Sequence, residues 1–255
     1  LLVGLELAKA LAYTSAKPLV PINHLEAHLM AASVAVADGW QPLVYPFVGL
    51  VVSGGHTSLY GVRGLGDYTL LGQTRDDAAG EALDKVGKML GLGYPGGIAI
   101  DRLAATGDPR AIAFPRGLVQ RASLEFSFSG LKTAVATYLG KLSSPPREQA
   151  LADLCASVLE AVVDVLLRKT LRATEDFGAR HIVISGGVSA NRRLRARLAE
   201  VCREAGLSAS VPPLGLCTDN AAMVAGLGYL RLQAGHALAP AEAMRLNARS
   251  SWALC

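Results

Sequence analysis

Two histidines four residues apart, His24 and His28, are the residues of this sequence best placed to do chemistry. The apolar residues that follow His28 favour a helix, and in a helix the two imidazoles lie on one face, one turn apart. At that spacing two neutral ring nitrogens can reach a single metal ion. A pair of unrelated surface histidines gives the same pattern, so the spacing alone leaves both interpretations open.

The nearest carboxylate, Glu26, is placed wrongly for a metalloprotease. Such a site needs a glutamate directly after the first histidine, where it can activate a water. Glu26 stands two positions after His24, which turns it by roughly 200° around the helix axis. We therefore expect Glu26 to point away from any metal, and the sequence argues against peptide hydrolysis.

Two apolar runs each end in Ser-Gly-Gly. Residues 47–52 are continuously apolar and β-branched, and apolar β-branched residues follow His181 at 182–184, which predicts buried strands over 47–52 and 181–184. Glycines after a strand allow backbone N–H groups to approach an anion, and a helix that follows adds a favourable dipole. One glycine pair would be a simple turn. Two pairs after two buried strands favour a nucleotide cleft, at Ser53-Gly54-Gly55 and Ser185-Gly186-Gly187.

Two aspartates are candidate acceptors for the ribose hydroxyls of that nucleotide. Asp84 lies in an amphipathic helix expected over 76–90, and Asp101 follows a glycine loop expected at 94–97. Carboxylates bind ribose hydroxyls in dinucleotide sites. A helical aspartate is also a common solvated or paired surface group, so this role depends on the cleft being present.

The remaining pattern predicts an α/β fold. Helices are expected over 1–15, 98–106, 147–175, after Asn191 and from Asn220 to 233, and short strands over 19–22 and 58–62. Four arginines follow Asn191 and alternate with leucines, which favours a solvated basic face over a leucine stripe more than an RNA groove. These arginines are Arg192, Arg193, Arg195 and Arg197.

Composition limits the class of protein. The chain has 255 residues, of which 51% are hydrophobic and 18% charged, so it can bury a large core. A net charge of +4 allows a polyanionic partner without proving one. The four cysteines form no C-x-x-C pair, which favours a reducing, cytoplasmic setting. The sequence contains neither a membrane-spanning run nor a signal peptide. It opens in mid-helix at Leu1, which suggests a missing natural start.

Six segments together resemble one family, the tRNA N6-adenosine threonylcarbamoyltransferases of the bacterial TsaD type, formerly described as O-sialoglycoprotein endopeptidases. In order they are NHLEAH, VVSGGHTSLY, DDAAGEALDKVGKMLGLGYPGG, FSFSGLKTA, SGGVSANRRLR and CTDNAAM. The resemblance runs from residue 1 to a variant of the family's C-terminal segment at 249–254. It implies an actin-like, sugar-kinase-like fold of two lobes with a ligand between them. We expect the first lobe to comprise 1–30 with 230–255 packed back on it, and the second to comprise 31–229.

The resemblance also implies a reaction. The family moves a threonylcarbamoyl group from its adenylate to the exocyclic amine of the adenosine 3′ of the anticodon in tRNA. It implies one divalent metal per chain, Fe²⁺ before Zn²⁺, on His24, His28 and Asp219. The aspartate follows from the family match and not from spacing. The implied substrate-binding residues are Val51, Val52, Ser53, Gly54, Gly55, Asp84, Gly97, Asp101 and Asn191. No general base is evident in the sequence. The reaction does not require an obvious one, because positioning and electrostatics can supply much of the catalysis.

The family further implies two protein partners beside tRNA and threonylcarbamoyl-adenylate: an inactive paralogue of TsaB type and a P-loop ATPase of TsaE type. A metalloprotease, a non-catalytic scaffold and a sugar kinase are the alternatives. About 80 residues of the family pattern, carrying a phosphate-binding turn, precede the part that matches Leu1. We therefore expect this chain alone to bind metal but to transfer threonylcarbamoyl poorly or not at all.

Overall fold

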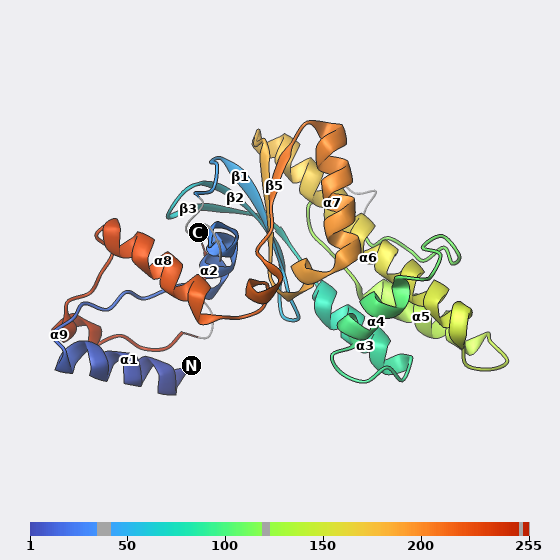
Figure 1. The fold of residues 1–255 in the computed structure, drawn as a ribbon, viewed down its shortest axis with the longest axis horizontal. Helices are drawn as coiled ribbons and strands as arrows, with labels where there is room; N and C mark the ends of the chain where they lie inside the picture. Colours follow the sequence, from blue (N-terminus) through green and yellow to red (C-terminus); the bar gives the residue numbers. More distant parts are fainter. Residues whose placement is uncertain (35–41, 119–122, 250–251, 255) are drawn as a thin grey trace.

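A mixed five-stranded sheet with helices on both faces forms the centre of the protein in a computed structural model (Figure 1). The structure describes residues 1–34, 42–118, 123–249 and 252–254. The α/β class expected from the sequence is confirmed. None of the described helices is both long and apolar enough to cross a bilayer.

The sheet has the strand order β3-β2-β1-β4-β5. Its strands are β1 (Phe47–Val52), β2 (Thr57–Gly64), β3 (Asp67–Gln73), β4 (His181–Ser185) and β5 (Ser208–Ser210). β1 pairs antiparallel with β2 and parallel with β4, in a register that sets Val51 beside Ser185. Because β1 and β4 are neighbours and run the same way, the Ser-Gly-Gly turns that follow them meet at one edge of the sheet.

The side chains of β1 alternate between two hydrophobic cores, as a strand covered on both faces requires. Phe47 and Val51 belong to the core beneath the histidine helix, with Leu29 and Leu227. Val48, Leu50 and Val52 belong to the other core, which contains most of the buried apolar residues of the long helix α6 (Glu148–Phe177). Each core therefore positions a different set of the predicted site residues.

The helices divide between the two faces of the sheet (Figure 1). On one side lie α2 (His24–Met30) and α8 (Ala221–Gln233), with α1 (Leu2–Thr14) and α9 (Pro240–Ala243) beyond them. On the other side lie α3 (Ala79–Met89), α4 (Gly96–Ala104), α5 (Ser129–Gly140), α6 (Glu148–Phe177) and α7 (Arg192–Ala205). Three 3₁₀ turns complete the described elements: η1 (Ala31–Ser33), η2 (Gly187–Ala190) and η3 (Leu214–Leu216).

Two expected elements are wrong. The strand expected over 19–22 is reduced to one bridge between Leu19 and Leu238. The glycine loop expected at 94–97 ends earlier, because Pro95 is the N-cap of α4 and Gly96 and Gly97 already lie in that helix. Gly96 lies against Gly87 of α3, where a Cβ on Gly87 would be 2.5 Å from Gly96 Cα, so the start of α4 packs closely on α3.

The helix expected from Asp76 begins only at Ala79. Asp76 is instead held by the segment before α5, where its carboxylate accepts hydrogen bonds from the backbone N–H groups of Phe128 (2.8 Å) and Ser129 (3.3 Å). These are unsatisfied donors at the start of α5, so Asp76 caps a helix that lies about 50 residues further along the chain. Such a long-range cap has no local sequence pattern.

A glycine in the centre of β1 lets the histidine helix approach the sheet. A Cβ added at Gly49 would lie 2.2 Å from Leu29 Cδ2, and Leu29 is fully buried. The absent side chain therefore leaves the space that Leu29 of α2 fills. The position of His24 and His28 depends on this contact, since they are on the same short helix.

We predict that Gly49→Ala destabilises the protein by about 1–3 kcal/mol, because it overpacks the seat of α2. Leu29→Ala should cost about 2–5 kcal/mol through the cavity it leaves. The double variant should cost clearly less than the sum, because the new methyl group occupies part of that cavity. Free energies of unfolding from urea titrations measure all three, and strictly additive values would show that the two residues do not share this space.

Candidate metal centre and nucleotide turns

The histidine helix α2 is anchored at its first turn. Asn23 is its N-cap, and the side-chain Oδ1 accepts hydrogen bonds from the N–H groups of Leu25 (2.9 Å) and Glu26 (3.3 Å). The Asn23 amide donates to the carbonyl of Trp252 at 2.8 Å. The C-terminal segment thus holds the end of the helix from which His24 projects.

His24 and His28 lie on one face of α2, as their spacing predicts, with ring centroids 4.6 Å apart. His24 is half exposed, whereas the side chain of His28 is only 2% exposed. Burial lowers the pKa of His28, and the neighbouring His24 lowers it further, although Asp219 acts in the opposite direction. The lowered pKa favours the neutral imidazole, which is the form that binds a metal.

Asp219 completes a group of three potential ligands. It lies between η3 and α8, and its Oδ1 is 3.1 Å from His28 Nε2 and 3.5 Å from His24 Nε2. The ligand atoms of the three residues all lie within 4.8 Å of one another. The Asp219 side chain is 77% exposed, so one side of the group is open to solvent.

This donor set fits a small divalent metal ion. Atoms bound at about 2.0–2.2 Å to one ion stand about 3.0–3.4 Å from each other, and the two histidine–aspartate distances are close to that value. Two imidazoles and one carboxylate with open positions are a set used by non-haem iron and by zinc. The nitrogen of His28 that faces Asp219 is Nε2. The other ring nitrogen, Nδ1, is buried and has no partner among the described residues.

Glu26 points away from this group, as its position on the helix predicts. Its carboxylate is fully buried and accepts two hydrogen bonds each from Arg231 Nε and Nη2, at 2.7–3.1 Å. Tyr68 donates a further hydrogen bond at 2.7 Å. Burial raises the pKa of Tyr68, and the adjacent Glu26 carboxylate raises it further. Glu26 thus ties α2 to α8 and β3, and its carboxylate is not directed at the metal-ligand group.

The first glycine turn, Ser53-Gly54-Gly55, is open to a ligand. The Ser53 hydroxyl accepts hydrogen bonds from the N–H groups of Gly55 (3.3 Å) and His56 (3.1 Å). A Cβ at Gly54 or Gly55 would meet nothing within 4 Å. The side chains of the preceding Val51 and Val52 are fully buried, so these two valines can offer a ligand only their backbone.

The second glycine turn has two different glycines. Gly186 has a φ of 91°, and its Cβ would lie 2.4 Å from the carbonyl oxygen of Val52, so the fold itself requires glycine there. Gly187 is less confined, and its Cβ would lie 3.7 Å from Thr218 Cγ2. The second turn is therefore in contact with the end of β1 on one side and with the loop that carries Asp219 on the other.

The other predicted substrate residues form two hydrogen-bonded pairs joined by α4. Asp84 Oδ1 accepts the N–H of Gly97 at 3.0 Å. One turn further along α4, Asp101 Oδ1 accepts from the Asn191 amide at 2.8 Å. Asn191 also caps α7 through the N–H of Leu194. Both aspartates are thus held in place by protein donors, while a carboxylate still has lone pairs free for further donors.

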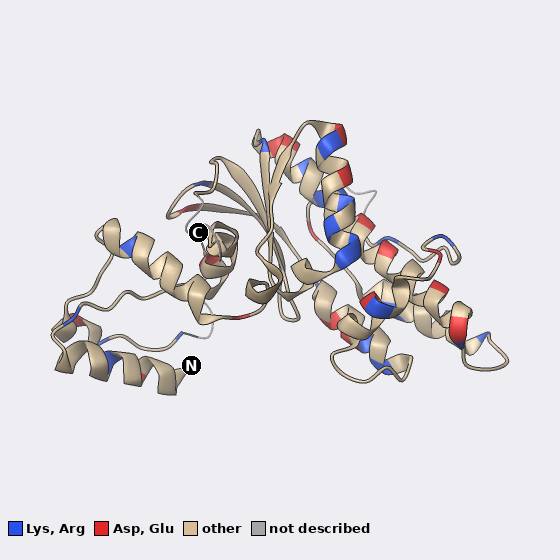
Figure 2. Ribbon diagram, viewed as in Figure 1, with Lys and Arg blue, Asp and Glu red and all other residues tan. Residues whose placement is uncertain are grey.

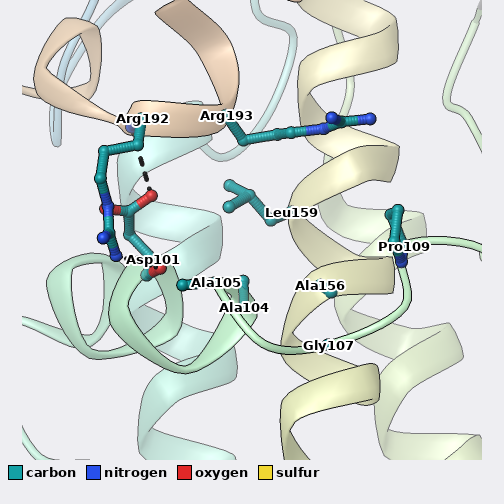
Figure 3. A pocket seen from close by; sticks show the side chains of 9 residues that line it. All are labelled: Asp101, Ala104, Ala105, Gly107, Pro109, Ala156, Leu159, Arg192 and Arg193. Carbon is teal, nitrogen blue, oxygen red and sulfur yellow. Dashed lines mark hydrogen bonds and ion pairs between the residues drawn. The ribbon is translucent and has the colours of Figure 1, made fainter. Parts of the chain in front are cut away.

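A pocket of about 310 Å³ lies beside Asp101 between α4, α6 and α7 (Figure 3). Asp101 and Arg192 lie together on one wall of it, with Arg192 Nε 3.1 Å from Asp101 Oδ2. The opposite wall is apolar and includes Ala156 and Leu159. The pocket is separate from the metal-ligand group, whose residues do not line it.

The arginines that crowd the start of α7 (Figure 2) are largely paired within the protein. Arg192 pairs with Asp101, and Arg193 pairs with Glu160 at 2.6 Å. Leu194 and Leu198 are buried in the core. The leucine stripe expected from the sequence is confirmed.

His56 was not assigned a role from the sequence, although it follows the first glycine turn directly. It lines a cavity of about 650 Å³ together with His24. Burial lowers the pKa of His56, and His24 lowers it further. A histidine directly after a Ser-Gly-Gly turn was the available signal.

Comparison with known proteins supports the family resemblance seen in the sequence. The family model described as TsaD, tRNA N6-adenosine threonylcarbamoyltransferase, matches residues 1–226. A protein of that name from Anaeromyxobacter dehalogenans is 54% identical over 255 residues, which are 100% of this chain and 74% of that protein. One from Geobacter sulfurreducens is 50% identical and covers 100% of this chain and 72% of that protein.

Two solved structures share the fold. A full-length HypF, crystallised in the phosphate- and nucleotide-bound form, has a TM-score of 0.60 at 13% identity and covers 84% of this chain and 36% of that protein. HypF of T. kodakarensis has a TM-score of 0.65 at 15% identity, over 89% of this chain and 39% of that protein. The actin-like, sugar-kinase-like fold expected from the sequence is consistent with these matches.

The Glu26–Arg231 pair leads to a prediction about stability. Arg231→Met leaves a buried carboxylate without its cation, which should cost about 3–5 kcal/mol. Glu26→Gln in the same chain removes the stranded charge and should recover part of that loss. Free energies of unfolding from urea titrations test both, and a single variant as stable as the unaltered protein would show that Glu26 is not held by this pair.

Proposed function

The chain belongs to the tRNA N6-adenosine threonylcarbamoyltransferase family, and from that premise we propose that His24, His28 and Asp219 hold a divalent metal beside an adenylate site. The observation that carries the proposal is the convergence of the three ligand atoms next to the two glycine turns. Neither the histidine pair nor the turns would suffice alone.

The family reaction transfers a threonylcarbamoyl group from threonylcarbamoyl-adenylate to the N6 amine of the adenosine 3′ of the anticodon in tRNA. A bond forms between N6 and the carbamoyl carbon, and the bond from that carbon to the phosphate oxygen breaks. AMP leaves with the electron pair, and the amine loses a proton. Since AMP is a good leaving group, the protein has mainly to hold the two substrates in line.

A bound metal would supply Lewis acidity toward the carbonyl or carboxylate of the threonylcarbamoyl group. The neutral His28 and the half-exposed His24 would hold it from α2, with Asp219 opposite. Fe²⁺ is the metal we propose first, because two histidines and a carboxylate with open positions suit non-haem iron, and Zn²⁺ is the alternative. The exposed side of Asp219 leaves room for the substrate.

We propose that the adenylate is held by the backbone of 51–55 together with Asp84, Gly97, Asp101 and Asn191. The open space beside Gly54 and Gly55, where a Cβ would meet nothing within 4 Å, suits the approach of a phosphate to the backbone. The two aspartates on α3 and α4 suit ribose hydroxyls, and Asp101 is already oriented by Asn191.

Other proposals concern organisation and partners. Residues 1–30 with 230–255 would form part of one lobe and 31–229 the second; the bridge between Leu19 and Leu238 and the hydrogen bond from Lys9 to the Leu246 carbonyl (3.1 Å) support the first grouping. An inactive paralogue and a P-loop ATPase are the proposed protein partners, and the cytoplasm, where tRNA is modified, is the proposed location.

Peptide hydrolysis, the main alternative, finds no support at this site. Glu26 is fully buried and bound to Arg231 and Tyr68. A metal on this chain would therefore lack the adjacent glutamate that activates water in such proteases.

The metal proposal predicts one ion per purified chain, lost in the double variant His24→Ala/His28→Ala and in Asp219→Asn. His236→Ala is the matched control, because His236 is an exposed histidine beyond α8. Elemental analysis measures the content. In cells depleted of their own enzyme, any t6A nucleoside that the chain restores should disappear with the double variant and persist with the control. Full metal content in the double variant, or t6A that survives it, would contradict the proposal.

The nucleotide proposal predicts that Gly55→Val weakens adenylate binding about tenfold to a hundredfold, the value of a lost charge-assisted hydrogen bond. Gly64→Val is the matched control, because a Cβ there also meets nothing within 4 Å. Gly186→Val is unsuitable, since its side chain would strike the Val52 carbonyl and disturb the sheet. Calorimetry with the adenylate tests both variants, and equal affinities would show that the first turn does not approach the ligand.

A further inference from the structure

The loop that carries Asp219 is fixed from a distance by one arginine. Arg195 lies in the first turns of α7, and its guanidinium donates hydrogen bonds to two carbonyls and a thiol. Nε donates to the Ser189 carbonyl at 2.7 Å, and Nη2 donates to the Pro212 carbonyl at 2.6 Å. Nη2 also lies 3.1 Å from Cys217 Sγ. The other arginines of this turn, Arg192 and Arg193, pair with carboxylates.

We propose that Arg195 is a positioning residue that holds the Asp219 loop against the second glycine turn. The proposal rests on the proposed function, because it concerns the metal and nucleotide groups assigned there. Arg195 itself touches neither group, and it acts by joining the two loops that carry them.

The Asp219 loop needs such an anchor. Asp219 is 77% exposed, so packing of its own side chain does little to fix it. Two residues earlier, Cys217 is fully buried, with Sγ 3.6 Å from the Pro212 carbonyl and 3.5 Å from the Pro213 carbonyl. One residue later, Asn220 caps α8. Asp219 therefore stands between two fixed points, and Arg195 binds the first of them.

The other end of the clamp is the second glycine turn. Ser189, whose carbonyl Arg195 binds, lies in η2, two residues after Gly187. A Cβ at Gly187 would lie 3.7 Å from Thr218, so the two loops are already in contact beside Asp219. A guanidinium can serve these acceptors at once because its donors form a rigid planar fork. Lysine, with a single ammonium centre, cannot reproduce that geometry.

The test uses Arg195→Met and Arg195→Lys, with Arg203→Met as the matched control. Arg203 is an exposed arginine on the last turn of the same helix. The first measurement is the rate at which Cys217 reacts with N-ethylmaleimide, followed by peptide mass spectrometry. Cys155 and Cys202, both buried, serve as internal controls for the cores. The second measurement is metal affinity by calorimetry with Zn²⁺.

We expect Arg195→Met to raise the Cys217 labelling rate while Cys155 and Cys202 stay protected. Metal affinity should fall by about tenfold, the lower end of what removing an outer support of a metal ligand costs. Arg195→Lys should be intermediate, and Arg203→Met should match the unaltered protein.

Three outcomes would overturn the proposal. One is a Cys217 rate in Arg195→Met equal to that of the unaltered protein. Another is simultaneous labelling of Cys155, Cys202 and Cys217, which would mean that α7 simply unfolds. The third is selective labelling of Cys217 with unchanged metal affinity. If the unaltered chain binds no metal, the proposed function fails, and selective labelling still supports the clamp between the two loops.

Discussion

The parallel pairing of β1 with β4 is the constraint on which the rest of this structure depends. Both strands are buried on both faces, and both end in Ser-Gly-Gly at the same edge of the sheet. Because parallel neighbours end together, the two turns are adjacent although more than 130 positions of sequence separate Ser53 from Ser185. The register of the pair, with Val51 beside Ser185, also places Gly186 against the Val52 carbonyl. A side chain at Gly186 would therefore disturb the sheet and the site together.

The two faces of the sheet contribute different parts of the site. One core seats the histidine helix on β1 through the space left by Gly49, and the Glu26–Arg231 pair ties that helix to α8. Asp219 lies just before α8. The Glu26–Arg231 pair, which holds Glu26 away from the candidate metal group, also fixes α8 beside α2 and so keeps Asp219 near the two histidines. The other core supports α3, α4 and α7, which carry Asp84, Asp101 and Asn191. The proposed metal ligands and the proposed nucleotide residues therefore come largely from opposite faces of the sheet.

Sequence patterns predicted the parts of the fold that depend on local chemistry. The apolar runs of β1 and β4, the one-turn spacing of the histidines and the helices expected after Asn191 and from Asn220 all appear in the structure. β3 was not predicted, because a strand at the sheet edge has mixed burial and lacks a clear alternation. The start of α3 was placed too early, because Asp76 is held by a distant helix end.

Sequence patterns likewise predicted only some features of the candidate site. The orientation of Glu26 away from the two histidines followed from helix geometry alone, since a residue's angle around a helix needs no knowledge of what it packs against. The place of Asp219 did not, because it lies 191 residues from His28 and only its family segment pointed to it. Arg195 was grouped with the basic face of α7, where four arginines follow one cap. Its partners lie in loops before and after that helix, at Ser189, Pro212 and Cys217, and no periodicity within the helix distinguishes it from Arg192 or Arg193. The residue types of the candidate site can be read from the sequence, but which of them lie next to one another cannot. The fold brings them together where the parallel strands β1 and β4 end.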